Sequence, residues 1–301
     1  MQGYFTLNYY CNQKCITCPT SSNQKKLESI EFENLKKNIL ESYHKGMKQI
    51  VLSGGEPFAY KDIHNVISLL YDLDLGVTIL TNGTLINDVI INLLTPLKER
   101  LTIVTAIHSS DENVHDYVTG VKGSFNKAFY NLKTLNKLGF NVHIKIILNK
   151  LNYLNINTLF NLIENNFCNK VLINICSMDY CGVAKNHFEL YVNADEIDKA
   201  LSSAVEYLKI NKKTNIRLHF SEFPICFMNS ETIKYLMIRP MRTQFAFQAV
   251  NSQNVRYDTL YDCIPRGEKC AKCLCKTVCS GFWSSIESKI VTDLTPFISK
   301  R

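Results

Sequence analysis

Three cysteines near the start of the chain have the spacing of ligands to one metal centre. Cys11, Cys15 and Cys18 are separated by three and then by two residues. Thiolates at this spacing can converge from a single loop, and no neighbouring side chain is an obvious fourth ligand. Cysteine thiolates hold iron–sulfur clusters, and an open coordination position lets a metal centre bind a substrate or cofactor. The spacing predicts a reactive iron–sulfur cluster, with a zinc loop or unconnected thiols as the alternatives.

The cysteines gather in two groups, one near each end of the chain, with a few single ones between. The chain has 12 of them. The second group comprises Cys263, Cys270, Cys273, Cys275 and Cys279. Such grouping is typical of metal ligands in a reducing compartment rather than of the disulfide framework of a small secreted protein.

The elements that must position these residues alternate between strand and helix. Short apolar runs predict six strands, at residues 5–7, 49–52, 77–80, 101–107, 142–148 and 171–176. Apolar residues three and four positions apart predict amphipathic helices at 32–44, 63–72, 125–138 and 155–165. Strand–helix–strand units pair their strands in parallel through right-handed crossovers. The sequence therefore predicts an α/β fold, a partial (β/α)6 barrel.

Polar turns follow the predicted strands and are expected on one rim of this barrel. The turns begin at Ser53, Thr81, His108, Asn149 and Ser177. Loops at the C-terminal ends of barrel strands form the active site in barrel enzymes. Because the cysteine loop follows the first strand, we expect it on the same rim.

Beyond about residue 185 the alternation is expected to break. Residues 194–210 predict a helix, 215–221 a strand and 223–228 a turn, and the segment through Tyr257 carries little pattern. No linker or repeat marks a free second domain. We therefore expect a barrel over 1–190 and a small cysteine-rich extension packed on it over 191–301.

Composition and charge narrow the partners. The net charge of +7 comes from 34 basic and 27 acidic residues, and the basic residues are scattered rather than concentrated in one stripe. This distribution indicates solvated surface and argues against nucleic acid as a partner. No apolar run reaches the roughly 18 residues of a membrane span, and the start shows neither a basic leader nor an apolar signal region. We expect a cytoplasmic protein that does not bind membranes.

The cysteine loop and the turn after the second strand together resemble one enzyme family. Cys11, Cys15 and Cys18, followed one unit later by Gly54–Pro57, are similar to the motifs of the radical S-adenosylmethionine (SAM) enzymes. The resemblance implies a [4Fe-4S] cluster whose fourth iron is chelated by the amino and carboxylate groups of SAM. It also implies an electron donor such as a flavodoxin or ferredoxin.

The resemblance assigns roles to residues of the predicted rim. Gly54 and Gly55 would let the backbone approach the methionyl amino group, Glu56 would accept a hydrogen bond from that ammonium, and Pro57 would stiffen the turn. Later strand ends would complete the SAM site, with contacts from Asn82, Ser109 and Asn149, and with Lys145 or His108 facing the cavity. Polar residues at strand ends also serve as caps and turn residues. Thr17 departs from the family, which often has an aromatic residue there, and puts in doubt a stacking contact near the adenine.

The C-terminal cysteines resemble the auxiliary-cluster (SPASM or twitch-like) extension of many radical SAM peptide-modifying enzymes. Four thiolates, from Cys226, Cys270, Cys273 and Cys279, would hold a second [4Fe-4S] cluster. Cys263 and Cys275 remain, and either could replace one of the four. Zinc is the alternative, because a pair of cysteines two residues apart suits it equally well.

A closer resemblance covers about residues 5–286. The segments 108–111, 115–117, 122–125, 144–152, 181–186 and 279–285 are similar to the radical SAM maturases of the His-Xaa-Ser peptide system. This resemblance implies an enzyme that reductively cleaves SAM to a 5′-deoxyadenosyl radical and modifies a ribosomally made precursor peptide. It leaves room for a second maturase as a partner.

Two residues just past the sixth strand suggest a finer role. The thiol of Cys181 could donate a hydrogen atom to a substrate radical, and Tyr180 could relay a radical, although buried inert side chains are commoner. Cys168 and Cys176 are predicted to be core residues. Two other functions remain open: a radical SAM enzyme acting on a small molecule or nucleotide, and a non-catalytic zinc or iron–sulfur module.

Overall fold

The structure of the chain is a computed structural model. It describes residues 1–22, 28–237, 244–259, 268–276, 278–279 and 281. Cys263, one of the spare cysteines of the second group, lies outside the described residues.

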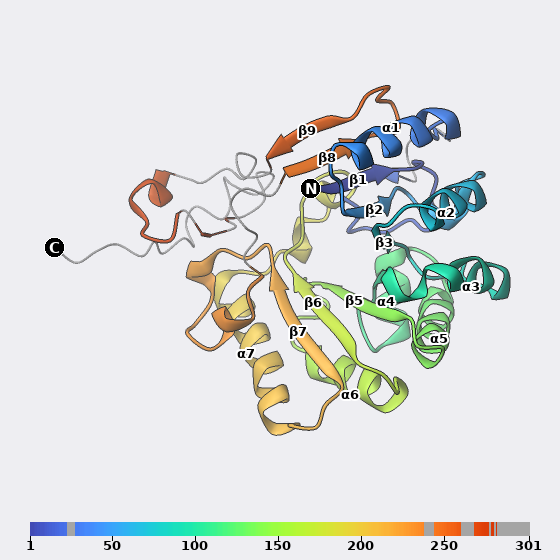
Figure 1. The fold of residues 1–301 in the computed structure, drawn as a ribbon. Helices are drawn as coiled ribbons and strands as arrows, with labels where there is room; N and C mark the ends of the chain where they lie inside the picture. The colour runs from blue at the N-terminus through green and yellow to red at the C-terminus, as the bar shows by residue number, and fades with distance from the viewer. Residues whose placement is uncertain (23–27, 238–243, 260–267, 277, 280, 282–301) are drawn as a thin grey trace.

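A curved nine-stranded sheet forms the centre of the molecule (Figure 1). Its strands are β1 (Gln2–Thr6), β2 (Gln49–Ser53), β3 (Gly76–Leu80), β4 (Leu101–Ala106), β5 (Asn141–Ile147), β6 (Val171–Cys176), β7 (Ile216–Ser221), β8 (Gln244–Gln248) and β9 (Arg256–Thr259). Their order is β7-β6-β5-β4-β3-β2-β1-β8-β9. All neighbours pair in parallel except β8 and β9, which are antiparallel.

Helices cover the outer side of this sheet (Figure 1). They are α1 (Phe32–His44), α2 (Ile63–Tyr71), α3 (Asp88–Leu94), α4 (Glu112–Thr119), α5 (Ser124–Lys137), α6 (Ile156–Asn166) and α7 (Ala194–Ile210). Most form for the reason that the sequence suggests, since their apolar residues recur at helical spacing and are buried, as in α5 and α6. The helices and the outer face of the sheet share one hydrophobic core.

Strand residues alternate between this core and the inside of the curved sheet. In β5, Val142, Ile144 and Ile146 are buried, whereas Lys145 and Ile147 are less buried and line an internal cavity. Successive side chains of a strand point to opposite faces, so every second residue faces inward. The chemistry of the cavity is therefore set by alternate strand residues.

The structure confirms the predicted fold class, a partial parallel barrel of strand–helix units. All six predicted strands are present, within a few residues of the predicted bounds. The alternation runs one unit further than expected, because α7 leads to β7 and β7 pairs in parallel with β6. The weak-pattern segment contributes β8, which pairs with β1. The division into 1–190 and 191–301 stays a prediction.

In the described part of the chain, no helix is both long enough and apolar enough to cross a membrane.

Candidate functional site

The three N-terminal thiols lie together on the loop that follows β1. Cys15 Sγ donates to Gln13 Oε1 at 3.4 Å, and Cys11 Sγ accepts from the Gln13 N–H at 3.4 Å. Burial raises the pKa of Cys11 to about 11. Burial, reinforced by the neighbouring Cys11 and Cys18, raises the pKa of Cys15 still further above its ordinary value. The thiols are therefore protonated at neutral pH, and a metal that binds them must displace protons.

Backbone hydrogen bonds fix this loop from two sides. Lys14 N donates to Thr119 O at 2.8 Å and Ile16 N to Val118 O at 2.9 Å, at the C-terminal end of α4. On the other side, Val183 N donates to Cys18 O at 2.9 Å. The loop is held by its main chain, so its thiols are free of that task.

The turn after β2 fixes the root of the loop. Gly55 N donates to Asn8 O at 2.9 Å and Glu56 N to Tyr10 O at 2.8 Å. A Cβ at Gly55 would lie 2.0 Å from Tyr10 O, and one at Gly54, whose φ is +152°, would lie 2.7 Å from Asn8 O. Both positions need glycine because the cysteine loop occupies the space of a side chain. The prediction gave the two glycines to SAM; the structure gives them this docking task.

Glu56 is completely buried, and its carboxylate accepts three hydrogen bonds. The donors are Thr81 Oγ1 at 2.7 Å, Asn82 N at 2.7 Å and Phe58 N at 3.1 Å. Burial raises the pKa of this carboxyl, and the three donors oppose that shift. Pro57, also buried, begins the short 3-10 turn Pro57–Ala59 that Glu56 caps. Glu56 thus joins the ends of β2 and β3 beside the cysteine loop.

Asn82 is the predicted SAM contact that lies nearest to the thiols. Its Nδ2 is 3.9 Å from Cys11 Sγ and donates to Asn12 Oδ1 at 2.7 Å. Its Oδ1 accepts from the hydroxyl of Thr84 at 2.7 Å. The amide therefore ties the turn after β3 to the cysteine loop.

Ser109 and Asn149 are buried residues of local turns. Ser109 Oγ accepts from Asp111 N at 3.1 Å, and Asn149 Oδ1 accepts from Leu151 N at 2.9 Å. The contacts of these two residues and of Asn82 with SAM stay predictions. His108 is fully buried and pairs with His115, whereas Lys145 lines the cavity.

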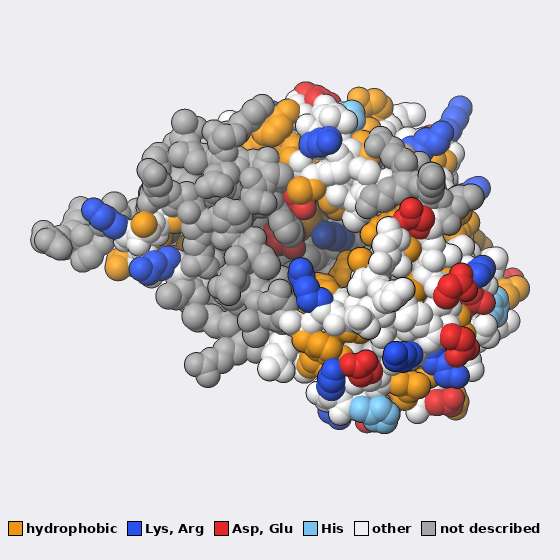
Figure 2. All heavy atoms as spheres, turned by 90° about the horizontal axis from the view of Figure 1, so that it is seen from above, with side chains coloured by type: hydrophobic (Ala, Val, Ile, Leu, Met, Phe, Trp, Pro, Cys, Tyr) orange, Lys and Arg blue, Asp and Glu red, His pale blue; other side chains and the backbone are white. Residues whose placement is uncertain are grey.

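Two hollows open beside the cysteine loop. The smaller, of about 420 Å³, is lined by Gly54, Ser53, Thr20 and Gly182 among others. The larger, of about 620 Å³, lies inside the sheet, and Thr17 and Pro19 of the cysteine loop line it. Tyr4 and Pro19 line both, so the two hollows adjoin. From above, charged and apolar side chains are visible within a depression of the surface (Figure 2).

The predicted radical residues differ in their placement. Cys181 is exposed, and the glycine after it packs on the cysteine loop, where a Cβ at Gly182 would lie 2.5 Å from Pro19. Tyr180 is buried beside Phe188, with ring centroids 4.9 Å apart. The catalytic roles of Cys181 and Tyr180 stay predictions.

Two cysteines predicted to be core residues have other settings. Cys168 is exposed, so its prediction is wrong. Cys176 is buried as predicted, but it also lines the larger cavity, because it is the last residue of β6 and alternation turns it inward.

The described C-terminal cysteines lie close to one another and to the barrel. Cys279 Sγ accepts from the N–H of Ile225 at 3.4 Å, next to Cys226. Burial, then Cys273 and Cys279, raise the pKa of Cys275. This places Cys275 among the candidate ligands as firmly as the four that were predicted. Within the described residues no three His, Cys, Asp or Glu side chains are placed to bind a single metal ion.

Comparison with protein families decides the identity of this arrangement. The model of the radical SAM superfamily matches residues 6–164, which include the cysteine loop and the Gly-Gly-Glu-Pro turn. The chain belongs to the radical SAM superfamily. Enzymes of this superfamily use a [4Fe-4S] cluster and SAM.

Radical SAM relatives of different activities resemble the chain. AlbA, an antilisterial bacteriocin subtilosin biosynthesis protein of Bacillus subtilis (strain 168), is 28% identical over 144 residues, 48% of this chain and 32% of AlbA. A probable GTP 3′,8-cyclase of Sulfurisphaera tokodaii is 25% identical over 212 residues, 69% of this chain and 66% of the cyclase. The chain thus spans about a third of AlbA and 66% of the cyclase.

A solved radical SAM structure shares the fold. The structure of Streptococcus suis SuiB bound to the precursor peptide SuiA matches with a TM-score of 0.63 at 18% identity, over 73% of this chain and 48% of SuiB. The strand–helix arrangement is therefore one that radical SAM enzymes adopt.

The residues present fit the radical SAM cofactors. Three thiols on a loop whose main chain is fixed elsewhere can each bind a separate iron of one cluster. The smaller hollow next to Gly54 and Ser53 adjoins that loop, and its size and polar lining suit a bound cofactor. Cys11, Cys15 and Cys18 would hold the cluster, and the residues lining this hollow would hold SAM.

Proposed function

We propose that this radical SAM enzyme modifies a ribosomally made precursor peptide. The observation that carries the proposal is the cavity of about 620 Å³ that adjoins the hollow beside the cysteine loop. The cavity is large enough for an amino-acid residue and part of its flanking chain. The names of AlbA, a bacteriocin biosynthesis protein, and of SuiB, bound to its precursor peptide, support a peptide as substrate.

The chain's own residues contribute positioning and exclusion of water. When bound, the cluster and SAM supply an electron and a reactive carbon centre that abstracts a hydrogen atom from the substrate. The main-chain contacts of the cysteine loop with α4, Gly55 and Val183 would hold the cluster against the mouth of the cavity. The apolar part of the cavity wall, which includes Val51, Leu80 and Phe247, would keep water from the substrate carbon.

We further propose a second [4Fe-4S] cluster in the C-terminal segment. The approach of Cys279 to Ile225 and the electrostatic interaction of Cys275 with Cys273 and Cys279 support it. Cytoplasmic location and a flavodoxin or ferredoxin as electron donor belong to the same proposal, since such clusters need a reducing compartment.

A radical SAM enzyme acting on a nucleotide is the second candidate. The probable GTP 3′,8-cyclase favours it, because its similarity extends over 69% of this chain, further than that of AlbA. The peptide is preferred because the chain presents no concentrated basic stripe that would attract a polyphosphate.

Co-expression with the short peptides encoded beside the gene tests the proposal. Mass spectrometry should show a changed mass in one peptide with the wild type and with Cys168→Ala, an exposed cysteine that serves as matched control. Cys15→Ala should abolish the change. If every peptide keeps its mass while the reduced enzyme releases 5′-deoxyadenosine faster with GTP, the nucleotide function replaces this one. If the reconstituted protein releases no 5′-deoxyadenosine at all, the enzyme assignment fails.

A further inference from the structure

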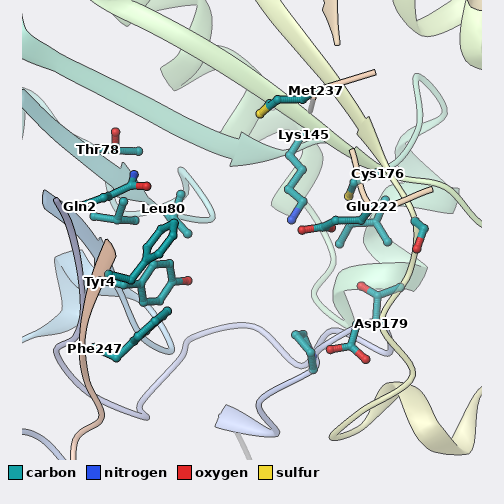
Figure 3. A pocket seen from close by; sticks show the side chains of 16 residues that line it. Gln2, Tyr4, Thr78, Leu80, Lys145, Cys176, Asp179, Glu222, Met237 and Phe247 are labelled. Atoms are coloured by element: carbon teal, nitrogen blue, oxygen red, sulfur yellow. The ribbon is translucent and has the colours of Figure 1, made fainter. Parts of the chain in front are cut away.

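The larger cavity has two chemically different walls. One wall is built from β5, β6 and β7, where register pairs Lys145 with Asn174 and Cys176 with Ser221. The other wall carries Tyr4 and Phe247, whose ring centroids lie 6.1 Å apart (Figure 3). A substrate in this cavity therefore meets polar groups on one side and aromatic rings on the other.

A lysine and a glutamate face each other on the polar wall. In Figure 3 the ammonium of Lys145 and the carboxylate of Glu222 point toward one another at the edge of the cavity. The Cys176 sulfur and the Glu222 carboxylate hold the pKa of Lys145 above its ordinary value although burial opposes them, so the lysine is charged. A charged donor and a charged acceptor are thus side by side where a substrate can reach both.

Two further observations mark this wall as a ligand site rather than a plain ion pair. Glu222 has a φ of +66°, a left-handed conformation that costs a residue other than glycine free energy and that collects at functional sites. On the same inward face, Asn174 donates to Ser221 Oγ at 3.1 Å, while its buried Oδ1 has no hydrogen-bond partner among the described residues. A buried acceptor without a donor calls for a ligand or a water.

We propose that Lys145 and Glu222 hold a main-chain amide of the peptide, and that the side chain of the same peptide residue packs on Tyr4 and Phe247. An amide presents one acceptor and one donor, which match an ammonium and a carboxylate. Because the two charges offset each other, a neutral group is preferred to an ion. The aromatic wall selects an aliphatic or aromatic side chain. This inference rests on the proposed peptide function and identifies the residue type that enters the cavity.

SAM is a poorer match for the pair. Lys145 and Glu222 line the larger cavity, whereas the hollow against Gly54 and Ser53 has neither of them in its lining. The carboxylate of SAM would also be repelled by Glu222. The test must nevertheless separate the two ligands.

The probe is N-acetyl-glycyl-leucyl-glycinamide, and its comparison compound is the same molecule with the leucyl N–H replaced by an ester oxygen. Both are titrated by saturation-transfer NMR into the anaerobically reconstituted full-length protein with SAM and without reductant, so that no turnover occurs. Wild type should bind the amide about tenfold more tightly than the ester, because the ester cannot donate to Glu222. This comparison needs no variant, so it stands even if a substitution unfolds the protein.

Variants then assign the effect to residues. Lys145→Met and Glu222→Gln should each weaken amide binding about tenfold, and Glu222→Gln should lose the preference for amide over ester. Lys199→Met, the same change at an exposed lysine of α7, should change nothing. SAM affinity, measured by calorimetry, should be equal in all four proteins.

Three results would overturn the inference. They are equal binding of amide and ester by wild type, no binding of either, and a Lys145→Met protein that loses affinity for SAM but not for the peptide. Failure of the proposed function looks different, because the tripeptide then binds as described while no co-expressed peptide changes mass.

Discussion

At the scale of single residues, the buried ionisable groups near the site differ in how they are satisfied. Glu56 has three donors to its carboxylate, so its negative charge is supported by the ends of β2 and β3. His108 and His115 instead share one contact, from the His108 N–H to His115 Nδ1 at 3.2 Å. Neither ring gains a partner that would support a positive charge, so both are suited to the neutral state alone.

The histidine pair predicts a loss of stability in mild acid. Burial lowers the pKa of His108 to about 3 and that of His115 to about 4, the latter against the attraction of Asp116. Because the unfolded chain binds these protons near pH 6.5, stability is fully present above that pH and falls as the pH drops toward the folded pKa values. Each histidine should cost about 2 kcal/mol between pH 8 and pH 5.

Urea denaturation of the metal-free protein across this pH range measures the effect. His115→Asn, whose side-chain oxygen can still accept from the His108 N–H, should flatten the pH dependence by about 2 kcal/mol. His64→Asn, at an exposed histidine of α2, is the control and should leave the slope as in wild type. An equal slope in all three proteins would contradict the assignment.

At the scale of elements, the site is made by turns docking on turns. The cysteine loop is fixed by the end of α4, by the turn after β2 and by the segment around Val183. These contacts use main-chain atoms, so the sequence shows them only where a side chain must be absent, as at Gly55.

A single methyl group should disturb this docking. In Gly55→Ala the added Cβ would meet main-chain atoms of Tyr10, which cannot move without shifting the cysteine loop. Overpacking of this kind costs about 1–3 kcal/mol. The expected result is reduced iron incorporation on anaerobic reconstitution, measured by iron content and visible absorbance.

Gly76→Ala is the matched control, since its Cβ would lie at an ordinary 3.5 Å from the nearest atom, in Gln49. It should incorporate iron like wild type. Full incorporation in Gly55→Ala would show that the loop does not need this contact.

Sequence patterns predicted those elements whose apolar residues recur with a clear period. α1, α5, α6 and α7 were expected nearly at their observed bounds, and Lys145 was among the residues expected at the cavity. α4 escaped because its buried residues include His115 and Thr119 and give no apolar stripe. β8 escaped because it is short and its place beside β1 depends on a contact between the two ends of the chain. Such non-local pairing leaves no local trace.

At the scale of the whole molecule, the C-terminal segment returns to the barrel through a cysteine. Cys279 accepts a hydrogen bond from Ile225, which follows β7, while β8 extends the sheet beside β1. The two cysteine groups are thus parts of one assembly in which a second cluster would sit at the β7 edge. Its ligands can be separated from those of the first cluster by counting iron.

Removing two C-terminal cysteines should remove one cluster and leave the other. A chain with two [4Fe-4S] clusters holds about eight irons, so Cys270→Ala combined with Cys273→Ala should retain about four. Because Cys11, Cys15 and Cys18 lie on a loop fixed by α4 and the turn after β2, this variant should still cleave SAM slowly when reduced. Cys11→Ala combined with Cys15→Ala should also keep about four irons but release no 5′-deoxyadenosine. Cys168→Ala, at an exposed cysteine, should keep all of its iron. Unchanged iron in the Cys270/Cys273 variant, or a wild type that carries about four irons and one zinc, would make the C-terminal site something other than a second iron–sulfur cluster.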